Sequence, residues 1–598
     1  MPSDWLNLTT HRLDIYNEKL AKTQFISQFE TLYQSGNCTK EALSELPTAY
    51  DYIRLGHPLS SVLEWTIAKL NGLNAENAIS FSSETMPILA ILRTNLLENR
   101  ATKILYTESL PKAFNQDLLK SIYGYHFEIQ QIDDLEHIEA FDGATILISK
   151  HQTVEANLQN EKIDFYVNLY EGLGSILLIS AKTKTSFISD IQHVRRRETI
   201  AMTPANCLVA LKAYTEQTSF SPQQLDTKTH KTEVKAIINN INATSGDALV
   251  ASSGLSMQYA IMMGLIDDAQ QKHPEKAINF IVPTNCYGGT NDQARRVVTC
   301  LENVEVLDLQ VDGDNDMVTS LERVLHSVAQ NDAVPYIIAE IPTNPRVEVP
   351  NLNNLKAVLT KRRQTPSGTT AIAPVFILDQ TFCPNVQFLG NDGILSNVKT
   401  IAYVSGSKFP SGGKCTAGYC VANAKAEILI QPIAKHLELC DNEATDLQYK
   451  ILSEQMPSML TRIEDAYKNT RAFVNYIHEV LPDAKINFVS EVLASEGFTP
   501  SVFSLDLPTK GNTDEEREAY KRALNLRLIN LMITEIPNES KYCVSYGQLK
   551  GCYWTVPATS TQGTTKEGDK DYIARVAVSP DLDLEKHKAV FLDFVDSL

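Results

Sequence analysis

A lysine at the end of an apolar run is the first residue in this sequence whose setting predicts chemistry. The mostly apolar run at 398–404 ends in Ser-Gly-Ser-Lys at 405–408, and a glycine-rich turn follows. A lysine on a protein surface needs no such setting. A lysine that acts as a nucleophile must be held in one place beside a buried element. Lys408 is therefore the candidate nucleophile.

Further polar groups stand at the ends of other predicted strands. The turn Ser252-Ser253-Gly254 lies between a strand and a helix, where backbone N–H groups and the helix dipole favour a phosphate. Tyr287 precedes two glycines, and its ring could stack on a planar ligand. Asn344 lies in a loop stiffened by two prolines, and Asp379 ends an apolar strand. A buried carboxylate is costly unless it is paired with a cation.

Together these residues match the needs of one cofactor, pyridoxal 5'-phosphate. Its aldehyde needs an amine, its ring nitrogen a carboxylate, its ring face an aromatic side chain, its phenolic oxygen a donor, and its phosphate N–H groups and hydroxyls. The residues that supply these groups, in that order, are Lys408, Asp379, Tyr287, Asn344, and the 252–254 turn with Ser405 and Ser407. We predict a pyridoxal-phosphate site without a metal, in which Lys408, Tyr287 and Asp379 are catalytic.

These motifs resemble the Cys/Met-metabolism family of pyridoxal-phosphate enzymes, over roughly residues 240–598. The family's Y-G-G-T is intact at 287–290, and its other motifs are represented at 252–255, 340–345, 379–381 and 405–408, with single changes such as Leu255 for methionine. Its R-(L/I)-S-V-G resembles the segment around Arg575, and its S-L-G resembles 545–547. The resemblance implies that Arg575 and Ser545 bind the substrate. It also adds Ser253, Gly254, Leu255 and Thr381 to the cofactor contacts.

The resemblance also implies an α/β architecture of three parts. Residues 226–430 are expected to form the large domain of the fold-type-I pyridoxal-phosphate transferases, with a mostly parallel seven-stranded sheet. Seven near-continuous apolar runs at 248–423 fit such a sheet because both of its faces are covered. Residues 431–598 are expected to form a smaller α+β domain. The polar segment at 219–233 is expected to link the large domain to the residues that precede it.

Residues 1–225 carry a partial match to the same family. The segment at 52–64 resembles the family's N-terminal arm, in which Tyr52 and Arg54 would reach the cofactor phosphate of a neighbouring subunit. A serine turn recurs at 82–85, but Glu84 stands in the place of glycine, and a carboxylate there would repel phosphate. We interpret residues 1–225 as a degenerate copy of the large domain. An unrelated α/β extension is the alternative.

Composition limits the compartment and the partners. The net charge of −18 disfavours nucleic acids and anionic membranes as partners. Ten cysteines without a CxxC pair favour a reducing compartment. The sequence has neither the apolar core of a signal peptide nor a run of about 18–20 apolar residues. We therefore expect a cytoplasmic protein, and the family implies a homodimer or homotetramer.

The expected reaction is trans-sulfuration of the cystathionine γ-synthase type. In that reaction a thiol replaces the γ-substituent of an O-acylhomoserine, so the partners are small amino acids such as a homoserine ester, cysteine or cystathionine. A cystathionine or methionine γ-lyase and an O-acetylhomoserine sulfhydrylase are the alternatives within the family. Outside it stand an aminotransferase, which would lack the Y-G-G-T motif, and a non-catalytic regulatory homologue. The intact Lys408 and Asp379 argue against the last.

Overall fold

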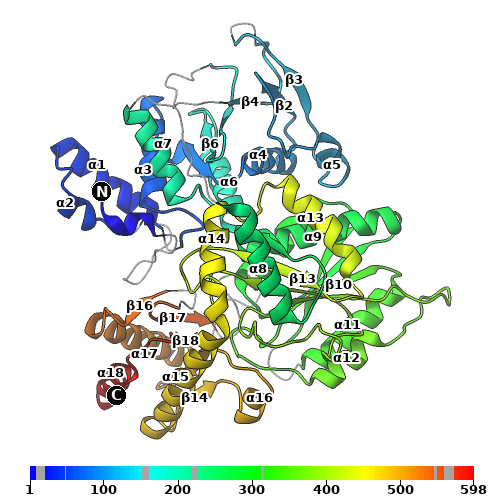
Figure 1. The fold of residues 1–598 in the computed structure, drawn as a ribbon, viewed down its shortest axis with the longest axis vertical. Coiled ribbons are helices and arrows are strands. Elements are labelled where there is room, and N and C mark those ends of the chain that lie inside the picture. Colours follow the sequence, from blue (N-terminus) through cyan, green and yellow to red (C-terminus); the bar gives the residue numbers. More distant parts are fainter. Residues whose placement is uncertain are drawn as a thin grey trace.

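The computed structural model describes residues 1–7, 21–47, 49–50, 52–135, 138–150, 160–216, 226–311, 316–543, 548–557 and 572–598. Within these residues the chain is mixed α/β, as the sequence predicts, and contains three sheets. Figure 1 shows the first sheet at the top of the view, the second in the middle and the third at the lower left.

The first sheet lies within residues 78–179. Its strands are β1 (Ala78–Phe81), β2 (Thr102–Tyr106), β3 (Glu128–Gln131), β4 (Ala144–Lys150), β5 (Phe165–Tyr170) and β6 (Gly174–Ile179). Their order across the sheet is β1-β6-β5-β4-β2-β3. β6 is antiparallel to both of its neighbours, and the remaining pairs are parallel. The helices of this part are α1 (Ala21–Ser35), α2 (Lys40–Ser44), α3 (Pro58–Leu70), α4 (Met86–Leu97), α5 (Gln116–Ser121), α6 (Thr185–Arg197) and α7 (Pro204–Glu216).

The second sheet has seven strands and positions the candidate site. Its strands are β7 (Leu249–Ala251), β8 (Ile278–Pro283), β9 (Val304–Leu309), β10 (Val334–Glu340), β11 (Val375–Asp379), β12 (Lys399–Ser405) and β13 (Gly418–Ala422). Their order is β7-β13-β12-β11-β10-β8-β9, and β13 alone is antiparallel to its neighbours. The carboxyl ends of β10, β11 and β12 therefore meet at one edge of the sheet.

Helices cover both faces of the second sheet. They are α8 (Thr227–Asn242), α9 (Gly254–Lys272), α10 (Gly288–Val298), α11 (Met317–Gln330), α12 (Leu352–Thr360), α13 (Ile430–Leu439) and α14 (Asp446–Gln455). Neighbouring residues of β7 point to different cores: Leu249 packs in the core of α9 and α13, and Val250 in the core of α8 and α11. Burial on both faces explains why these strands are near-continuous apolar runs.

The third sheet has five strands and lies beside long helices. Its strands are β14 (Lys485–Asn487), β15 (Val502–Asp506), β16 (Ser540–Tyr542), β17 (Gly551–Pro557) and β18 (Tyr572–Ala577), in the order β14-β15-β18-β17-β16. The helices are α15 (Met459–Val480), α16 (Glu491–Ser495), α17 (Asp514–Glu535) and α18 (Leu584–Asp596). Buried residues of α15, α17 and α18 share one apolar core with β15, β17 and β18.

The structure corrects one sequence-based expectation about the link at 219–233. Residues 219–225 lie outside the described residues, but the second half of this segment is the start of α8. The Asp226 side chain caps that helix by accepting from the Thr229 N–H at 3.3 Å. Val234 and Ile238 are fully buried against the second sheet, so helix packing overrides the polar composition of the segment.

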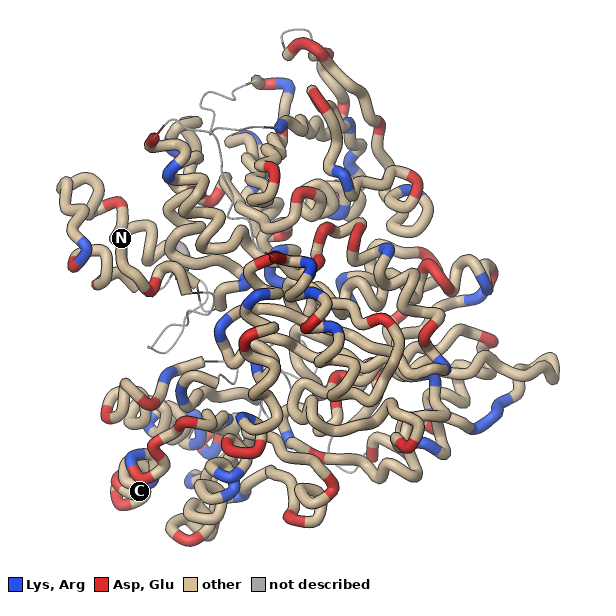
Figure 2. The backbone as a smooth tube through the Cα atoms, viewed as in Figure 1, with Lys and Arg blue, Asp and Glu red and all other residues tan. Residues whose placement is uncertain are grey.

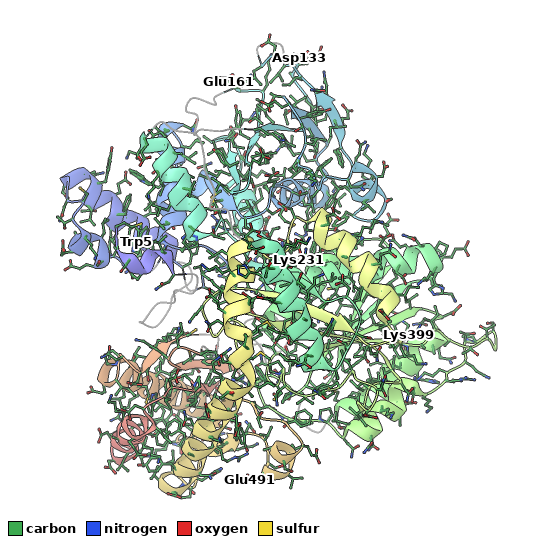
Figure 3. The ribbon with its side chains drawn as sticks, viewed as in Figure 1. Trp5, Asp133, Glu161, Lys231, Lys399 and Glu491 are labelled. Carbon is green, nitrogen blue, oxygen red and sulfur yellow. The ribbon has the colours of Figure 1, made fainter. Side chains whose placement is uncertain are left out.

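Charged residues are distributed over all three parts of the molecule. Figure 2 shows Lys and Arg interspersed with Asp and Glu along the backbone, in keeping with a chain of net charge −18. Some pairs join elements of different parts of the sequence: Lys231 on α8, labelled in Figure 3, contacts Glu443 in the loop before α14. Among the described residues, no helix combines the length and the apolar character that crossing a membrane requires.

Candidate active site

A cavity of about 150 Å³ lies at the carboxyl edge of the second sheet. All three parts of the chain contribute to its wall. The lining residues from the second part include Gly254, Leu255, Tyr287, Glu340, Asn344, Asp379, Thr381, Ser405 and Lys408; the first part supplies Tyr52, Arg54, Arg196 and Arg197, and the third supplies Trp554, Val556 and Arg575. The polar residues that the sequence places at separate strand ends therefore share one cavity.

Lys408 is positioned by the turn between β12 and β13. Gly412 and Gly413 have φ angles of 60° and 76°, a left-handed conformation that glycine adopts without strain. The Gly413 N–H donates to the Lys408 carbonyl at 3.2 Å, which closes the turn around the lysine. The Lys408 Nζ lies 5.6 Å from the centre of the Tyr52 ring, so the amine faces the first part of the chain across the cavity.

Asp379 is the last residue of β11 and is fixed from two sides. Its Oδ1 accepts from the Thr381 N–H at 2.9 Å, and the Tyr403 phenol on β12 lies beside the carboxylate. Burial raises the pKa of Asp379, although Thr381, Tyr403 and the nearby Lys408 all lower it. A cationic ligand in the cavity would favour the charged carboxylate.

Glu340 lies directly beside Asp379 in the paired strands β10 and β11. Its Oε1 accepts from the Tyr287 N–H at 2.8 Å, and its buried Oε2 has no hydrogen-bond partner among the described residues. Burial and then the charge of Asp379 raise the pKa of Glu340 well above its usual value. The cavity wall therefore holds two adjacent carboxyl groups, and burial raises the pKa of both.

Tyr287 directly precedes α10 and presents its ring to the cavity. Gly289 leaves room for that ring, because a Cβ at position 289 would lie 2.4 Å from the Tyr287 Cε1. The phenol is hydrogen-bonded to Arg54. Burial raises the pKa of the phenol, but Arg54, Arg197 and Lys408 outweigh it and bring the pKa to about 8. Tyr287 can therefore exchange a proton near neutral pH.

The first turn of α9 forms one end of the cavity with the end of β12. Gly254 lies so close to Ser405 that an added Cβ would stand 3.0 Å from the Ser405 Cβ. The hydroxyls of Ser405 and Ser407 are 2.9 Å apart, and the Tyr52 hydroxyl donates to the Ser407 Oγ at 2.6 Å. A helix N-terminus surrounded by hydroxyls is a chemical setting that suits a phosphate.

Arg575 on β18 lines the cavity from the third part and is 2% exposed. Its Nη1 donates to the Pro345 carbonyl and, at 3.1 Å, to the Ser504 Oγ. Its guanidinium lies 5.5 Å from the ring centre of Phe382 and 5.7 Å from that of Trp554. A guanidinium held in this way can bind a carboxylate at two points.

The structure brings most of the predicted site residues to the cavity, with three exceptions. Ser253 does not line it, since its hydroxyl caps α9 by accepting from the Ser256 N–H at 3.0 Å. Ser407 lies behind the wall, where it contacts Ser405 and Tyr52. Ser545 lies outside the described residues. No cluster of metal-ligating side chains occurs in the part of the chain that the structure describes.

The chain has distant likenesses among solved structures. It is similar to a cystathionine gamma synthase from Xanthomonas oryzae pv. oryzae, with a TM-score of 0.45 and 14% identity over 63% of this chain and 89% of that one. It is also similar to a cystathionine gamma-lyase from Lactobacillus plantarum complexed with L-serine, with a TM-score of 0.45 and 17% identity over 63% and 88%. No protein-family model and no curated protein matches the sequence. Because the sequence identities and TM-scores are low, the function is inferred from the geometry of the site.

Several cavity residues are not identified from the sequence, among them Arg197, Tyr403 and Gln258. Arg197 ends α6 in a run of three arginines, a pattern typical of a solvated helix face, yet its side chain is buried and its Nε donates to the Asp292 Oδ2 at 2.5 Å. Tyr403 donates to the Gln258 Oε1 at 3.0 Å, and both side chains lie among apolar neighbours in the sequence. Buried polar side chains inside apolar runs were the available signal.

Proposed function

We propose that this protein is a pyridoxal-phosphate-dependent enzyme that acts on amino acids. The observation that carries the proposal is the convergence of Lys408, Asp379 and Tyr287 on one buried cavity that ends at a helix N-terminus. An amine, a buried carboxylate and an aromatic ring are the three groups that the ring of this cofactor requires. A buried polar cavity with perturbed pKa values is also the usual setting of an active site.

The residues of the cavity fit the cofactor. The close approach of Gly254 to Ser405 forms a cradle that any side chain at position 254 would fill. The phosphate would bind there, to backbone N–H groups of α9 and to the hydroxyl of Ser405, with Arg54 beside it. Asp379 would hold the ring nitrogen and Lys408 the aldehyde carbon. When bound, the cofactor supplies a ring that takes up electron density from the substrate's Cα.

The side chains of the chain itself then divide the work on the substrate. Arg575 orients the substrate by binding its α-carboxylate. Tyr287, with a pKa of about 8, accepts a proton from the substrate's ammonium group near neutral pH. The Lys408 amine moves protons at Cα and Cβ. Phe382, Trp554 and Val556 exclude water from one side of the cavity.

The proposed reaction is γ-replacement of the cystathionine γ-synthase type. The Cγ–O bond of an O-acylhomoserine breaks, a Cγ–S bond forms with a thiol, and the acyl group leaves as a carboxylate with release of the thiol proton. The sequence S-K-F-P-S-G-G at 407–413 supports this choice, since it resembles the form seen in long synthases. A hydrolytic γ-lyase reaction at the same site would release the γ-substituent without forming the new bond.

Two measurements test the proposal. The purified protein should bind pyridoxal phosphate with a visible absorbance band that hydroxylamine removes. It should then be offered O-acetylhomoserine, O-succinylhomoserine and cystathionine in parallel, with cysteine as the thiol. Cystathionine formed from either ester supports the synthase. A keto acid formed from cystathionine would identify a lyase, and failure to bind the cofactor would refute the proposal as a whole.

A further inference from the structure

The first and second sheets share one topology. Numbered within each part, the strand order is 1-6-5-4-2-3 in the first sheet and 1-7-6-5-4-2-3 in the second. In both sheets the last strand is antiparallel to its two neighbours, and every other pair is parallel. Among the described residues, the first sheet has one parallel strand fewer than the second sheet. Such an order is unusual enough that its recurrence in neighbouring segments indicates a relation between them.

The helices around the two sheets correspond as well. One helix precedes the first strand of each sheet, α3 or α8, and one follows it, α4 or α9. Two helices follow the last strand of each sheet, α6 and α7 in one case and α13 and α14 in the other, if the short turn before α13 is passed over. Among the described residues, segments 58–216 and 227–455 therefore have the same order of elements, except that the first has one strand and two helices fewer.

The two segments also make the same internal contact. The turn after the first strand is held by the loop between the last two helices. In the first segment the Ser82 N–H donates to the Ile200 carbonyl at 3.1 Å, and in the second the Ser252 N–H donates to the Asn442 carbonyl at 2.9 Å. These two loops contact each other, since the Thr199 Oγ1 donates to the Asn442 Oδ1 at 2.7 Å. Equivalent surfaces that meet each other are typical of a twofold interface.

We propose, on the basis of the function proposed above, that residues 52–216 are a diverged copy of the second part and complete the cofactor site within one chain. The copy supplies Tyr52, whose hydroxyl donates to Ser407, and Arg54, which is 8% exposed and hydrogen-bonded to Tyr287. It also supplies Arg197, which lines the same cavity. The first part thus supplies, from the same chain, residues that a second subunit supplies when a site is shared between two subunits.

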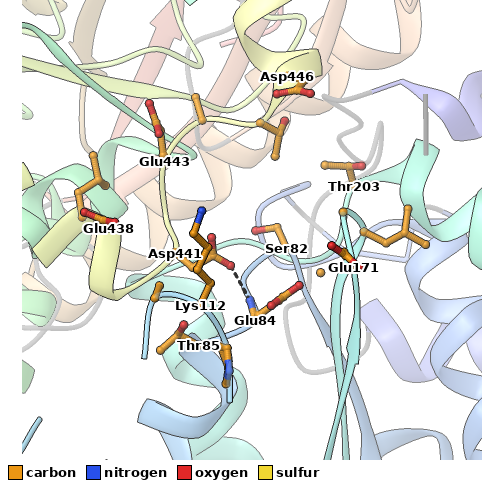
Figure 4. A pocket seen from close by; sticks show the side chains of 18 of the residues that line it. Ser82, Glu84, Thr85, Lys112, Glu171, Thr203, Glu438, Asp441, Glu443 and Asp446 are labelled. Carbon is orange, nitrogen blue, oxygen red and sulfur yellow. Dashed lines mark hydrogen bonds between the residues drawn. The ribbon is translucent and has the colours of Figure 1, made fainter. Parts of the chain in front are cut away.

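The reciprocal phosphate position in the copy is occupied by groups of the protein itself. Glu84 stands at the position that corresponds to Gly254, and its N–H donates to the Asp441 Oδ2 at 2.7 Å, the contact drawn in Figure 4. The Ser83 Oγ accepts from the N–H groups of Thr85 and Met86. Ser253 caps α9 in the same way, so the two turns differ at the Glu84 N–H, which is taken by the Asp441 carboxylate. Two carboxylates at this point would repel a phosphate dianion.

Asp441 adopts a conformation that supports this role. Its φ angle is +48°, a left-handed conformation that glycine would adopt at lower cost. In this conformation the Asp441 side chain, which belongs to the second part, accepts the hydrogen bond from the Glu84 N–H. The carboxylate of one copy thus occupies the helix N-terminus of the other, in a groove of about 1600 Å³ between them.

A complementation experiment tests whether the site is completed within one chain. Lys408→Ala removes the amine but leaves the arm, and Arg54→Ala weakens the arm but leaves the amine. Both chains are co-expressed with different tags, and the preparation is titrated with pyridoxal phosphate while the visible absorbance of lysine-bound cofactor is recorded. Arg54→Ala alone should bind the cofactor about ten- to a hundredfold more weakly than wild type. Arg100→Ala, which removes a half-exposed arginine of the same part, is the control.

The mixture decides between the two arrangements. If each arm serves its own chain, the mixture should show only weak sites, whether or not it contains mixed oligomers. Recovery of tight sites in the mixture would show that the arm acts across chains and would overturn the inference. An unchanged affinity in Arg54→Ala would overturn it too. Failure of the wild-type protein to bind the cofactor would instead refute the proposed function, so the two failures are distinguishable.

Discussion

Lys408 carries the proposed chemistry on a single atom. Its Nζ lies at the carboxyl edge of the sheet, opposite Tyr52, while Lys414 in the same turn is exposed to solvent. Lys408→Ala should leave the fold intact and abolish both the visible absorbance of the bound cofactor and turnover. Lys414→Ala is the matched control and should change neither. Normal turnover by Lys408→Ala would show that another amine performs the reaction.

Asp379 acts through its charge more than through its shape. Asp379→Asn keeps the size of the side chain and removes the negative charge that would pair with a protonated ring nitrogen. The variant should still bind the cofactor but remove the substrate's α-proton at least about tenfold more slowly, if ~1.4 kcal/mol of stabilisation is lost.

Exchange of that α-proton with deuterated solvent, followed by NMR, measures this effect. Asp308→Asn is the control, since Asp308 lies on β9 of the same sheet and pairs with Arg295 at a distance from the cavity. An exchange rate equal to that of wild type in Asp379→Asn would remove Asp379 from the mechanism.

At the scale of elements, the site depends on the close packing of β13 against the start of α9. A Cβ at position 418 would lie 2.4 Å from the Ser253 carbonyl oxygen and 2.7 Å from the Gly254 Cα. Both are backbone atoms, so Gly418→Ala must displace the turn that forms the phosphate end of the cavity. We expect a loss of about 1–3 kcal/mol in the free energy of unfolding, together with weaker cofactor binding.

Chemical denaturation and cofactor titration measure the two effects of Gly418→Ala. Gly246→Ala is the control, because its Cβ would meet only the end of the flexible Glu427 side chain at 3.1 Å. A Gly418→Ala protein with wild-type stability and affinity would show that the start of α9 does not need its present position.

Sequence patterns predict the strands whose residues form a continuous apolar run. All seven apolar runs of the second sheet are strands. In the first sheet, no pattern predicts β3, because Glu128–Gln131 is mostly exposed and polar. The three-residue strands β14 and β16 give no period that a pattern can detect.

The residues of the candidate site also divide into those that a local sequence pattern reveals and those that only the packing of distant segments reveals. Lys408, Asp379 and Tyr287 were identified because each stands at the end of an apolar run. Arg197 was not, because its role depends on packing between segments more than fifty residues apart, which no local pattern encodes. Ser253 was assigned to the cofactor from its motif, whereas its hydroxyl is used to cap α9.

At the scale of the whole molecule, the Asp441–Glu84 contact makes the junction between the two copies sensitive to pH. Burial and the charge of Glu443 raise the pKa of Asp441 to about 6, although the Glu84 N–H lowers it. The folded protein therefore holds this proton at pH values where the unfolded chain has lost it. The contribution of Asp441 to stability is complete below about pH 4 and is lost as the pH rises to about 6.

Unfolding experiments between pH 4 and 7 measure this dependence as a difference between two proteins. The wild-type protein should lose more stability over this range than Asp441→Asn, which cannot titrate. Groups away from Asp441 titrate equally in both proteins, so they cancel in the comparison. Glu84, whose pKa burial and then the Asp441 charge raise, changes the difference in the same direction. Parallel stability curves would show that Asp441 has an ordinary pKa and that the junction is not sensitive to pH in this range.

The blocked phosphate position of the copy also bears on how many cofactors the chain holds. Lys182 is the lysine of the first part that stands nearest in sequence to the position of Lys408, but its Nζ donates to the Glu161 carbonyl at 2.6 Å and pairs with Asp164 at 3.4 Å, and its side chain is 49% exposed. With Glu84 and Asp441 at the start of α4, the phosphate position of this part is blocked, and Lys182 does not line the groove beside it. We therefore expect one pyridoxal phosphate per chain of 598 residues.

The number of sites can be counted by borohydride reduction, which fixes lysine-bound cofactor. Mass spectrometry of the intact chain and of its peptides then shows how many lysines are labelled and which they are. The label should fall on Lys408 alone, and Lys182→Ala should carry the same amount as wild type. A second labelled lysine in residues 52–216 would show that the copy has kept a working site.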